Sequence, residues 1–172
     1  MTEINYDSYC GIYCGACSIM RAYRGGHKDR MAANYVEDSQ LKCHGCKSGT
    51  LFVNCSKCKI RDCAVSRKVE HCFECPEYPC RNINEHKNVE KMLPHLTLNR
   101  KNLQIVKESG CSEWLAQQEQ YWKCADCQTP FSWYAAKCHN CGSDLSNNTF
   151  KLSLFKFAIF KFLLRFTPGN KG

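Results

Sequence analysis

Apolar residues recur at helical spacing mainly between residues 84 and 120 of the chain. Within this stretch they stand three or four positions apart, a spacing that places them on one face of a helix. The residues concerned are Val89, Met92, Leu93, Leu96, Leu103, Val106, Trp114 and Leu115. Pro94 and the Ser109-Gly110 pair interrupt the pattern, because proline and glycine disfavour helix interiors. The pattern therefore predicts two or three short amphipathic helices.

The first 83 residues show little periodicity, with one exception near the start. Ser18 is suited to cap a helical run that reaches Ala22, and the Gly25-Gly26 pair then interrupts this run. The helical spacing resumes over residues 28–38. We expect the rest of this part to consist of loops and short elements.

The chain ends in a basic, phenylalanine-rich tail. Residues 150–166 contain twelve apolar residues, four basic residues and one serine. A membrane-spanning helix needs about 20 apolar residues, and a lysine at mid-bilayer costs about 2–3 kcal/mol. A helix lying on an anionic membrane surface costs less, because the lysine stems reach the headgroups. The two favoured interpretations are peripheral contact with an anionic membrane and packing against the body or a protein partner, and a true membrane span and nonspecific nucleic-acid contact are the lesser alternatives.

Composition explains why the N-terminal part lacks periodicity. Cysteine supplies 16 of the 172 residues, a level typical of disulfide scaffolds or metal proteins. The start, MTEINYDSYC, lacks a basic stretch followed by an apolar run, so we expect no secretory signal and a cytoplasmic location. Thiols stay reduced there. Six Cys-x-x-Cys pairs agree with this, because two thiols at this spacing can bind one metal ion.

Two of these pairs, separated by ten residues, predict a zinc ribbon in residues 121–145. Its ligands are Cys124, Cys127, Cys138 and Cys141. Gly142 supplies a permissive backbone after the last ligand, and residues 131–134 suit the intervening strand. Rubredoxin-like iron is the competing metal. Four thiolates close the coordination sphere, so we expect a structural site and an exposed His139 that is not a ligand.

Eleven further cysteines lie before residue 83. They are Cys10, Cys14, Cys17, Cys43, Cys46, Cys55, Cys58, Cys63, Cys72, Cys75 and Cys80. They occur in the order C-G-x-x-C-x-x-C, C-x-G-C, C-x-x-C-x-I-R-x-C-A and V-E-x-C-x-x-C-x-x-Y-P-C. This order, from Tyr9 to Arg81, resembles the cysteine-rich domain of unknown function numbered 3795.

Other positions add to the resemblance. The non-cysteine anchors are Gly11, Gly45, Ile60, Arg61, Ala64, Val69, Glu70, Tyr78 and Pro79. Longer members of that family carry S-G-x-x-x-W-L-x-x-Q-E followed by W-x-C-x-x-C, and this chain has the same motifs at 109–119 and 122–127. The resemblance therefore reaches nearly to Leu145 and excludes the tail. It implies a metal-binding protein and supplies no established activity.

The N-terminal cysteines divide by spacing into possible ligand sets. One four-thiolate site, with the spacing C-x2-C-x8-C-x2-C, is formed by Cys43, Cys46, Cys55 and Cys58. A second can be formed by Cys63, Cys72, Cys75 and Cys80. Cys10, Cys14 and Cys17 then lack a fourth ligand. The candidates for it are Cys111, His27, His44, His71 and His86, or no protein group at all, and crossed pairing between the segments stays open.

The unfilled position separates the structural and redox interpretations. The spacing C-x3-C-x2-C also holds the [4Fe-4S] cluster of radical enzymes, but the chain is too short for their barrel. We therefore expect zinc, with a noncatalytic or electron-carrying [4Fe-4S] cluster in the N-terminal domain as the alternative. No phosphate-binding, serine-hydrolase, zinc-protease or dinucleotide-binding motif occurs. Cys111 lies outside every cluster, and we expect an inert buried thiol rather than a reactive one.

These patterns predict a small, metal-stabilised α+β protein with four parts. They are an irregular cysteine-rich N-terminal domain (1–83), a helical connector (84–120), a zinc ribbon (121–145) and a basic amphipathic tail (146–172). The formal charge is +8, but residues 149–172 hold five of the 24 basic residues and no acidic one. Residues 1–148 therefore carry 19 basic and 16 acidic residues and are nearly neutral.

We therefore expect a nonenzymatic zinc-binding or adaptor protein with about three or four zinc sites and a protein partner. The first alternative is an iron–sulfur carrier or an accessory subunit of an oxidoreductase. The second is a nucleic-acid-binding zinc ribbon that uses Trp133 and Tyr134. It is disfavoured because the ribbon balances two lysines against two aspartates and so lacks a basic footprint.

Overall fold

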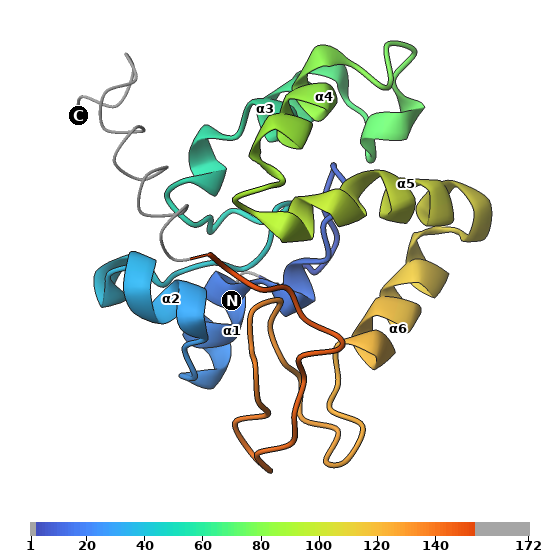
Figure 1. The fold of residues 1–172 in the computed structure, drawn as a ribbon. Coiled ribbons are helices and arrows are strands. Elements are labelled where there is room, and N and C mark those ends of the chain that lie inside the picture. The colour runs from blue at the N-terminus through green and yellow to red at the C-terminus, as the bar shows by residue number, and fades with distance from the viewer. Residues whose placement is uncertain (1–2, 154–172) are drawn as a thin grey trace.

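The computed structural model describes residues 3–153, which form six α-helices joined by loops and 3₁₀ turns. The helices are α1 (Ser18–Gly25), α2 (Arg30–Tyr35), α3 (Lys59–Arg67), α4 (Arg81–Val89), α5 (Leu98–Ser109) and α6 (Cys111–Tyr121). In Figure 1, α5 crosses the middle of the molecule, with α3 and α4 on one side of it. The loops that follow α6 lie on the other side, between α6 and the pair α1 and α2.

The prediction of helices between residues 84 and 120 is confirmed for α5 and α6, whereas Met92 and Leu93 lie in a turn between α4 and Pro94. Pro94 begins a 3₁₀ turn, Pro94–Thr97, directly before α5, and Gly110 separates α5 from α6 with a φ of +85°. The apolar residues of this stretch turn inward, with Leu103 and Trp114 fully buried. The structure adds α4, which begins at Arg81 and carries few apolar residues.

The predicted helical run near the start forms, but Ser18 does not cap it. Cys17 occupies the N-cap position of α1, and Ser18 is the first helical residue. The Ser18 hydroxyl donates instead to Asp29 Oδ2 at 2.5 Å. Asp29 is the N-cap of α2, where its Oδ1 accepts from the amides of Met31 and Ala32. One buried carboxylate thus fixes the starts of two helices.

The region after α6 contains less strand than an α+β protein requires. Within the described part of the chain, its strand pairing consists of two isolated antiparallel bridges, one between Lys123 and Pro130 and one between Lys137 and Asp144. The described residues are therefore mostly helical. The loops are short and cysteine-anchored, so their backbones turn back before a ladder can extend.

The larger of two hydrophobic clusters among the described residues joins the predicted parts. It includes residues from Ile12 to Leu152 and gathers aromatic side chains from the loops after α6. His95 stacks on Trp133 with ring centroids 3.9 Å apart, and its Nδ1 lies 2.6 Å from the Tyr134 hydroxyl. The Trp133 amide donates to the Ala16 carbonyl at 3.1 Å. The loops after α6 therefore pack directly on the N-terminal segment.

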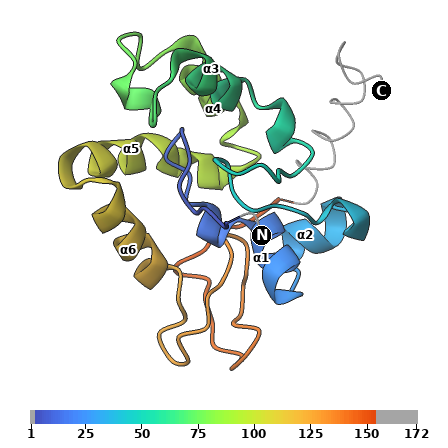
Figure 2. The same ribbon diagram turned by 180° about the vertical axis from the view of Figure 1, so that it is seen from behind.

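The N-terminal segment runs against α5, as Figure 2 shows from behind. Asn102 Nδ2 donates to the Gly11 carbonyl at 2.7 Å. Gly11 has a φ of +81°, and a Cβ there would lie 2.6 Å from the Asn99 carbonyl oxygen. Only glycine allows this approach, which accounts for its place in the cysteine motif.

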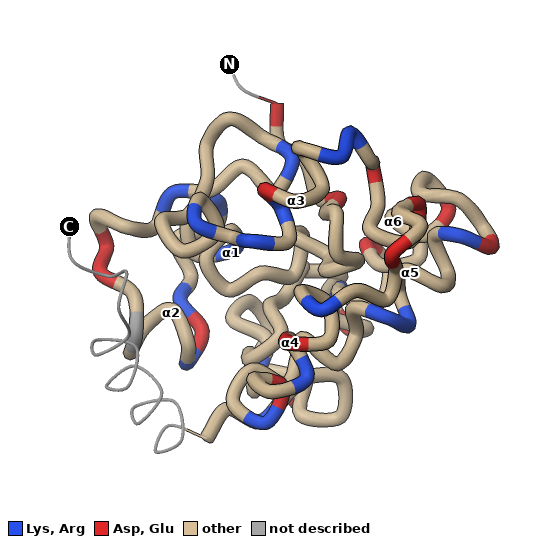
Figure 3. Tube along the Cα trace, turned by 90° about the horizontal axis from the view of Figure 1, so that it is seen from above, with Lys and Arg blue, Asp and Glu red and all other residues tan. Residues whose placement is uncertain are grey.

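Basic and acidic positions are both distributed over the described chain (Figure 3). This agrees with the nearly neutral body expected from the sequence. Most of the predicted tail lies outside the described residues, but its first part is described, and Leu152 is buried in the core. Within residues 3–153, no helix combines the length and apolar character needed to cross a membrane.

Candidate metal centres

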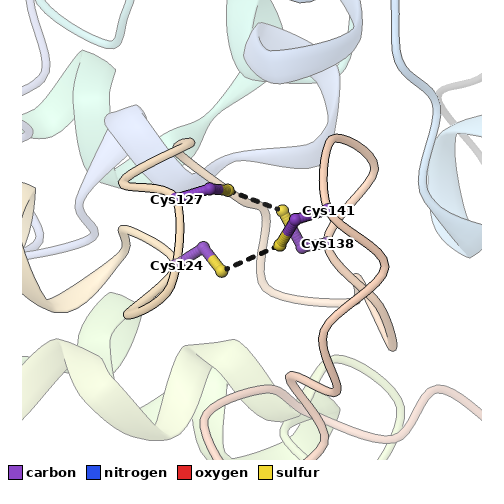
Figure 4. Close-up of side chains that lie close together, drawn as sticks. All are labelled: Cys124, Cys127, Cys138 and Cys141. Carbon is purple, nitrogen blue, oxygen red and sulfur yellow. Dashed lines mark hydrogen bonds between the residues drawn. The ribbon is translucent and has the colours of Figure 1, made fainter.

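Four cysteines after α6 point toward one another (Figure 4). The sulfurs of Cys124 and Cys141 are 3.6 Å apart, and those of Cys127 and Cys138 are 3.5 Å apart. All four ligand atoms lie within 4.8 Å of one another. A tetrahedral zinc ion with Zn–S bonds of about 2.3 Å has S···S edges of about 3.8 Å. The arrangement therefore fits one tetrahedral ion.

Each of the two Cys-x-x-Cys pairs stands in the same local turn. The Cys124 amide donates to the Thr129 carbonyl, and the Cys138 amide donates to the Ser143 carbonyl. The residue after each second cysteine is left-handed, with a φ of +57° at Gln128 and +80° at Gly142. The permissive role predicted for Gly142 is thus confirmed, while Gln128 adopts the same conformation with a side chain.

Local hydrogen bonds prepare two of these sulfurs for the thiolate form. Hydrogen bonds from Thr129 and Asn140 lower the pKa of Cys127 to about 5. Hydrogen bonds from Ser143 lower the pKa of Cys141 in the same way. Burial instead raises the pKa of Cys138 to about 11. A bound cation would bring this buried thiol to the thiolate form that metal ligation needs.

Three N-terminal Cys-x-x-Cys pairs form 3₁₀ turns. The turns begin at the first cysteine and are Cys14–Ala16, Cys55–Lys57 and Cys72–Glu74. In each, the amide of the second cysteine donates to the carbonyl of the first, at 3.1 to 3.3 Å. The turn places both thiols on one side of the chain. Cys17 and Cys58 then act as N-caps of α1 and α3, where the helix dipole favours negative charge.

The second predicted N-terminal set lines one cavity between α3 and α4, although its thiols do not form a tight group among the described residues. Its four thiols belong to Cys63, Cys72, Cys75 and Cys80. The cavity volume is about 20 Å³, which is room for one ion or one water molecule. Arg67 also lines it and donates from Nη1 to Cys75 Sγ at 3.5 Å. This guanidinium would offset part of the charge of four thiolates.

The other seven N-terminal cysteines interleave rather than separate into a group of four and a group of three. Burial and the nearby thiols of Cys46 and Cys17 raise the pKa of Cys14 well above its usual range. Burial raises the pKa of Cys17 to about 12, with a contribution from Cys43. The seven do not form a tight tetrahedral group in the described chain. Such crowding favours the protonated thiol over the thiolate until a cation binds among these cysteines.

Gly45 fixes the approach of the Cys43–Cys46 turn to the extended segment around Asn5. Its φ is +111°, and a Cβ there would stand 1.7 Å from the Asn5 carbonyl oxygen. The Gly45 amide donates to Cys43 Sγ at 3.4 Å. The Asn5 amide in turn donates to the His44 carbonyl at 2.8 Å. Only glycine lets the two segments pair so closely.

The N-terminal half of the chain matches one known protein family. Residues 6–85 match the family described as "Protein of unknown function (DUF3795)". The matched segment holds all eleven N-terminal cysteines and helices α1 to α3. No curated protein and no solved structure gives a significant match to the chain.

The DUF3795-like segment also takes part in a cluster that the sequence did not predict. Ligand atoms of Asp7, His71 and Cys111 lie within 4.8 Å of one another. Cys111 comes from α6, outside the matched residues. It was expected to be inert, and burial, followed by the neighbouring carboxylate of Asp7, raises its pKa to about 11. No spacing rule could have revealed this cluster, because its members come from three distant segments.

Other residues considered from the sequence, three histidines and two aromatic residues, make contacts that do not involve a candidate metal ion. His139 is exposed, as predicted, and its ring stacks on that of His27 at 4.5 Å. His86 accepts or donates a hydrogen bond with Asn99 at 2.7 Å. Trp133 and Tyr134 lie inside the core with 4% exposure each. They are therefore not available to stack on nucleic-acid bases.

Proposed function

We propose that this protein is a nonenzymatic zinc-binding module whose fold is held together by metal sites and which serves as a binding or adaptor unit. The observation that carries this proposal is the convergence of four sulfurs from Cys124 to Cys141 into a tetrahedral arrangement. The match to a cysteine-rich family of unknown function over residues 6–85 is compatible with it.

The ligand set favours zinc and a structural role. Four thiolates fill the coordination sphere of zinc and leave no position for water or substrate. A structural zinc site contributes roughly 10–16 kcal/mol of apparent binding free energy, which becomes folding free energy. This contribution matters in a chain whose loops after α6 contain two isolated bridges in place of a sheet.

The N-terminal thiols extend the same proposal. The cavity lined by Cys63, Cys72, Cys75 and Cys80 is sized for one ion. The interleaved seven, from Cys10 to Cys58, supply ligands for one or two more. The expected total from cysteine sites is therefore about three or four ions per chain.

The test is a metal count on protein purified without oxygen. We expect zinc at about three or four equivalents by elemental analysis, and loss of helical circular dichroism when a chelator removes it. Cys141→Ser should lose one equivalent. His139→Asn, in the same turn but exposed, should keep the wild-type count. A full helical spectrum after metal removal, or an unchanged count in Cys141→Ser, would overturn the proposal.

A second function has one specific observation in its favour. Seven cysteines from the segments 10–17 and 43–58, most of them partly buried, lie close enough to raise one another's pKa values and could hold a [4Fe-4S] cluster. The protein would then be an iron–sulfur carrier or an accessory subunit of an oxidoreductase. The protein purified without oxygen also tests this second function. Bound iron with visible charge-transfer absorption would support it, and protein without iron would eliminate it.

A further inference from the structure

The cluster of Asp7, His71 and Cys111 is separate from the group of Cys124, Cys127, Cys138 and Cys141 and offers three different kinds of metal ligand. Asp7 and His71 are each 6% exposed, and His71 Nε2 lies 3.0 Å from Asp7 Oδ1. Cys111 is partly buried at the first position of α6. The three side chains therefore meet in a largely water-excluded place.

We propose that Asp7, His71 and Cys111 bind a further divalent transition-metal ion, zinc in the first instance, through Oδ1, Nε2 and Sγ. Water completes the tetrahedron, so the site differs from the four-thiolate centres in having an open position. This site goes beyond the proposed structural zinc centres and does not depend on them.

The distances suit such an ion. Tetrahedral zinc with bonds of about 2.0–2.3 Å separates its oxygen, nitrogen and sulfur ligands by about 3.3–3.6 Å. The present N···O separation of 3.0 Å and the 4.8 Å limit on the whole group bracket these values. Side-chain rotations therefore suffice to close the site around an ion.

The surroundings of the cluster supply the partners that metal ligands need. Asp7 Oδ2 accepts from Lys47 Nζ at 2.6 Å, and Asp7 Oδ1 accepts from the Ser8 amide at 2.7 Å. His71 Nδ1 lies 3.5 Å from Glu74 Oε1. A carboxylate on the far nitrogen of a ligating histidine orients the ring and raises its basicity. The geometry thus provides an outer partner for two of the three ligands.

The local charge also favours a cation. Two carboxylates, those of Asp7 and Glu70, contact one ammonium, that of Lys47, and the carboxylate of Glu74 faces His71. The carboxylates therefore outnumber the ammonium, and burial weakens screening by water at Asp7, whereas Glu70 and Glu74 are exposed. A divalent ion with the thiolate of Cys111 would lower this excess.

A catalytic thiol is the competing interpretation of the same residues, and the geometry argues against it. An activated cysteine needs a base or a positive group beside its sulfur. His71 also lies within 4.8 Å of Cys111, but both of its ring nitrogens face carboxylates, Nε2 at 3.0 Å from Asp7 Oδ1 and Nδ1 at 3.5 Å from Glu74 Oε1. The carboxylate of Asp7 lies beside the Cys111 sulfur as well. A carboxylate next to the sulfur disfavours the thiolate unless a metal ion binds there.

The test counts metal equivalents in full-length variants. Cys111→Ser and Asp7→Asn should each lose one zinc equivalent relative to wild type, and zinc-edge X-ray absorption should lose part of its nitrogen and oxygen scattering. Ser112 is exposed in the same helical turn, and Ser112→Ala should keep the wild-type zinc count and the wild-type nitrogen and oxygen scattering. Unchanged counts in Cys111→Ser and Asp7→Asn would overturn the proposal.

A second variant decides the matter if Cys111→Ser or Asp7→Asn fails to fold. Glu74→Gln removes the outer carboxylate from His71 and should weaken one site by about 10–100-fold in chelator competition. Glu77→Gln, beyond Cys75, should leave that affinity unchanged. Equal affinities in Glu74→Gln and wild type would overturn the proposal. Cys141→Ser reports separately on the four-thiolate centre, so the two proposals can fail independently.

Discussion

The hydroxyl of Ser132 donates to Asp29 Oδ2 at 2.5 Å, across 103 residues of sequence. The same oxygen accepts from Ser18, and the other oxygen of Asp29 caps α2. Asp29 is 5% exposed and Ser132 is 4% exposed. This buried carboxylate therefore ties the loops after α6 to the first two helices.

Asp29→Ala should destabilise the protein by about 2–4 kcal/mol, because it removes a helix cap and leaves two buried hydroxyls without their acceptor. The measurement is the free energy of unfolding of the metal-loaded protein in denaturant. Asp38→Ala is the control, since the Asp38 side chain is 80% exposed and its ion pair with Lys28 lies at the surface. We expect a change below about 1 kcal/mol there. Equal losses in both variants would contradict the role of Asp29.

His95 should make stability depend on pH. Burial lowers its pKa to about 3, so the folded protein keeps it neutral while the unfolded chain binds a proton below about pH 6.5. Stability from this group is thus complete above pH 6.5 and falls as the pH drops from there toward 3. Between pH 7 and 5.5 the loss should be about 1 kcal/mol.

The comparison of unfolding free energies at those two pH values in wild type and His95→Gln isolates this contribution. The variant keeps a polar side chain beside Tyr134 but does not titrate, so its loss should be smaller by about 1 kcal/mol. His27→Gln is the control, because His27 is exposed. The metal content is measured at both pH values. An identical pH dependence in wild type and His95→Gln would show that His95 is not held neutral.

Gly45→Ala should prevent the Cys43–Cys46 turn from docking on Asn5. The new Cβ would stand 1.7 Å from a backbone oxygen at a φ of +111°, and we expect a loss of about 3 kcal/mol or more. Gly49→Ala, in the same loop, meets no atom within 4 Å and should change stability by less than about 0.5 kcal/mol. Thermal unfolding measures both. Similar midpoints for the two variants would refute the close approach.

Removal of residues 154–172 should leave the fold and the metal count intact. Leu152 is buried in the core, and the Phe150 amide donates to the Trp133 carbonyl at 2.7 Å, so a chain ending at Ser153 keeps these contacts. The sequence-based proposal of peripheral membrane contact through residues 150–166 predicts that this truncation abolishes flotation with anionic vesicles. Neutral vesicles are the control. Flotation of the truncated protein would place membrane contact elsewhere.

The sequence by itself determined the local structure around the cysteines and the helix breaks. A Cys-x-x-Cys pair closes a turn through contacts within four residues, so the four-cysteine group after α6 and three N-terminal turns could be predicted from spacing alone. The break at Gly110 could be predicted in the same way, because glycine readily adopts the positive φ that the structure shows there. Both kinds of feature depend on neighbours in sequence, where spacing and backbone preference decide.

Only the tertiary structure decided which distant segments meet. The sequence placed Ser18 as a cap, but a longer-range partner, Asp29, takes its hydroxyl. It left Cys111 outside every cluster, whereas packing of α6 brings it to Asp7 and His71. The sequence did not decide whether Trp133 is exposed or buried, and the structure shows it stacked on His95 in the core. Such contacts depend on how whole elements bury their apolar faces together, and no local pattern encodes that arrangement.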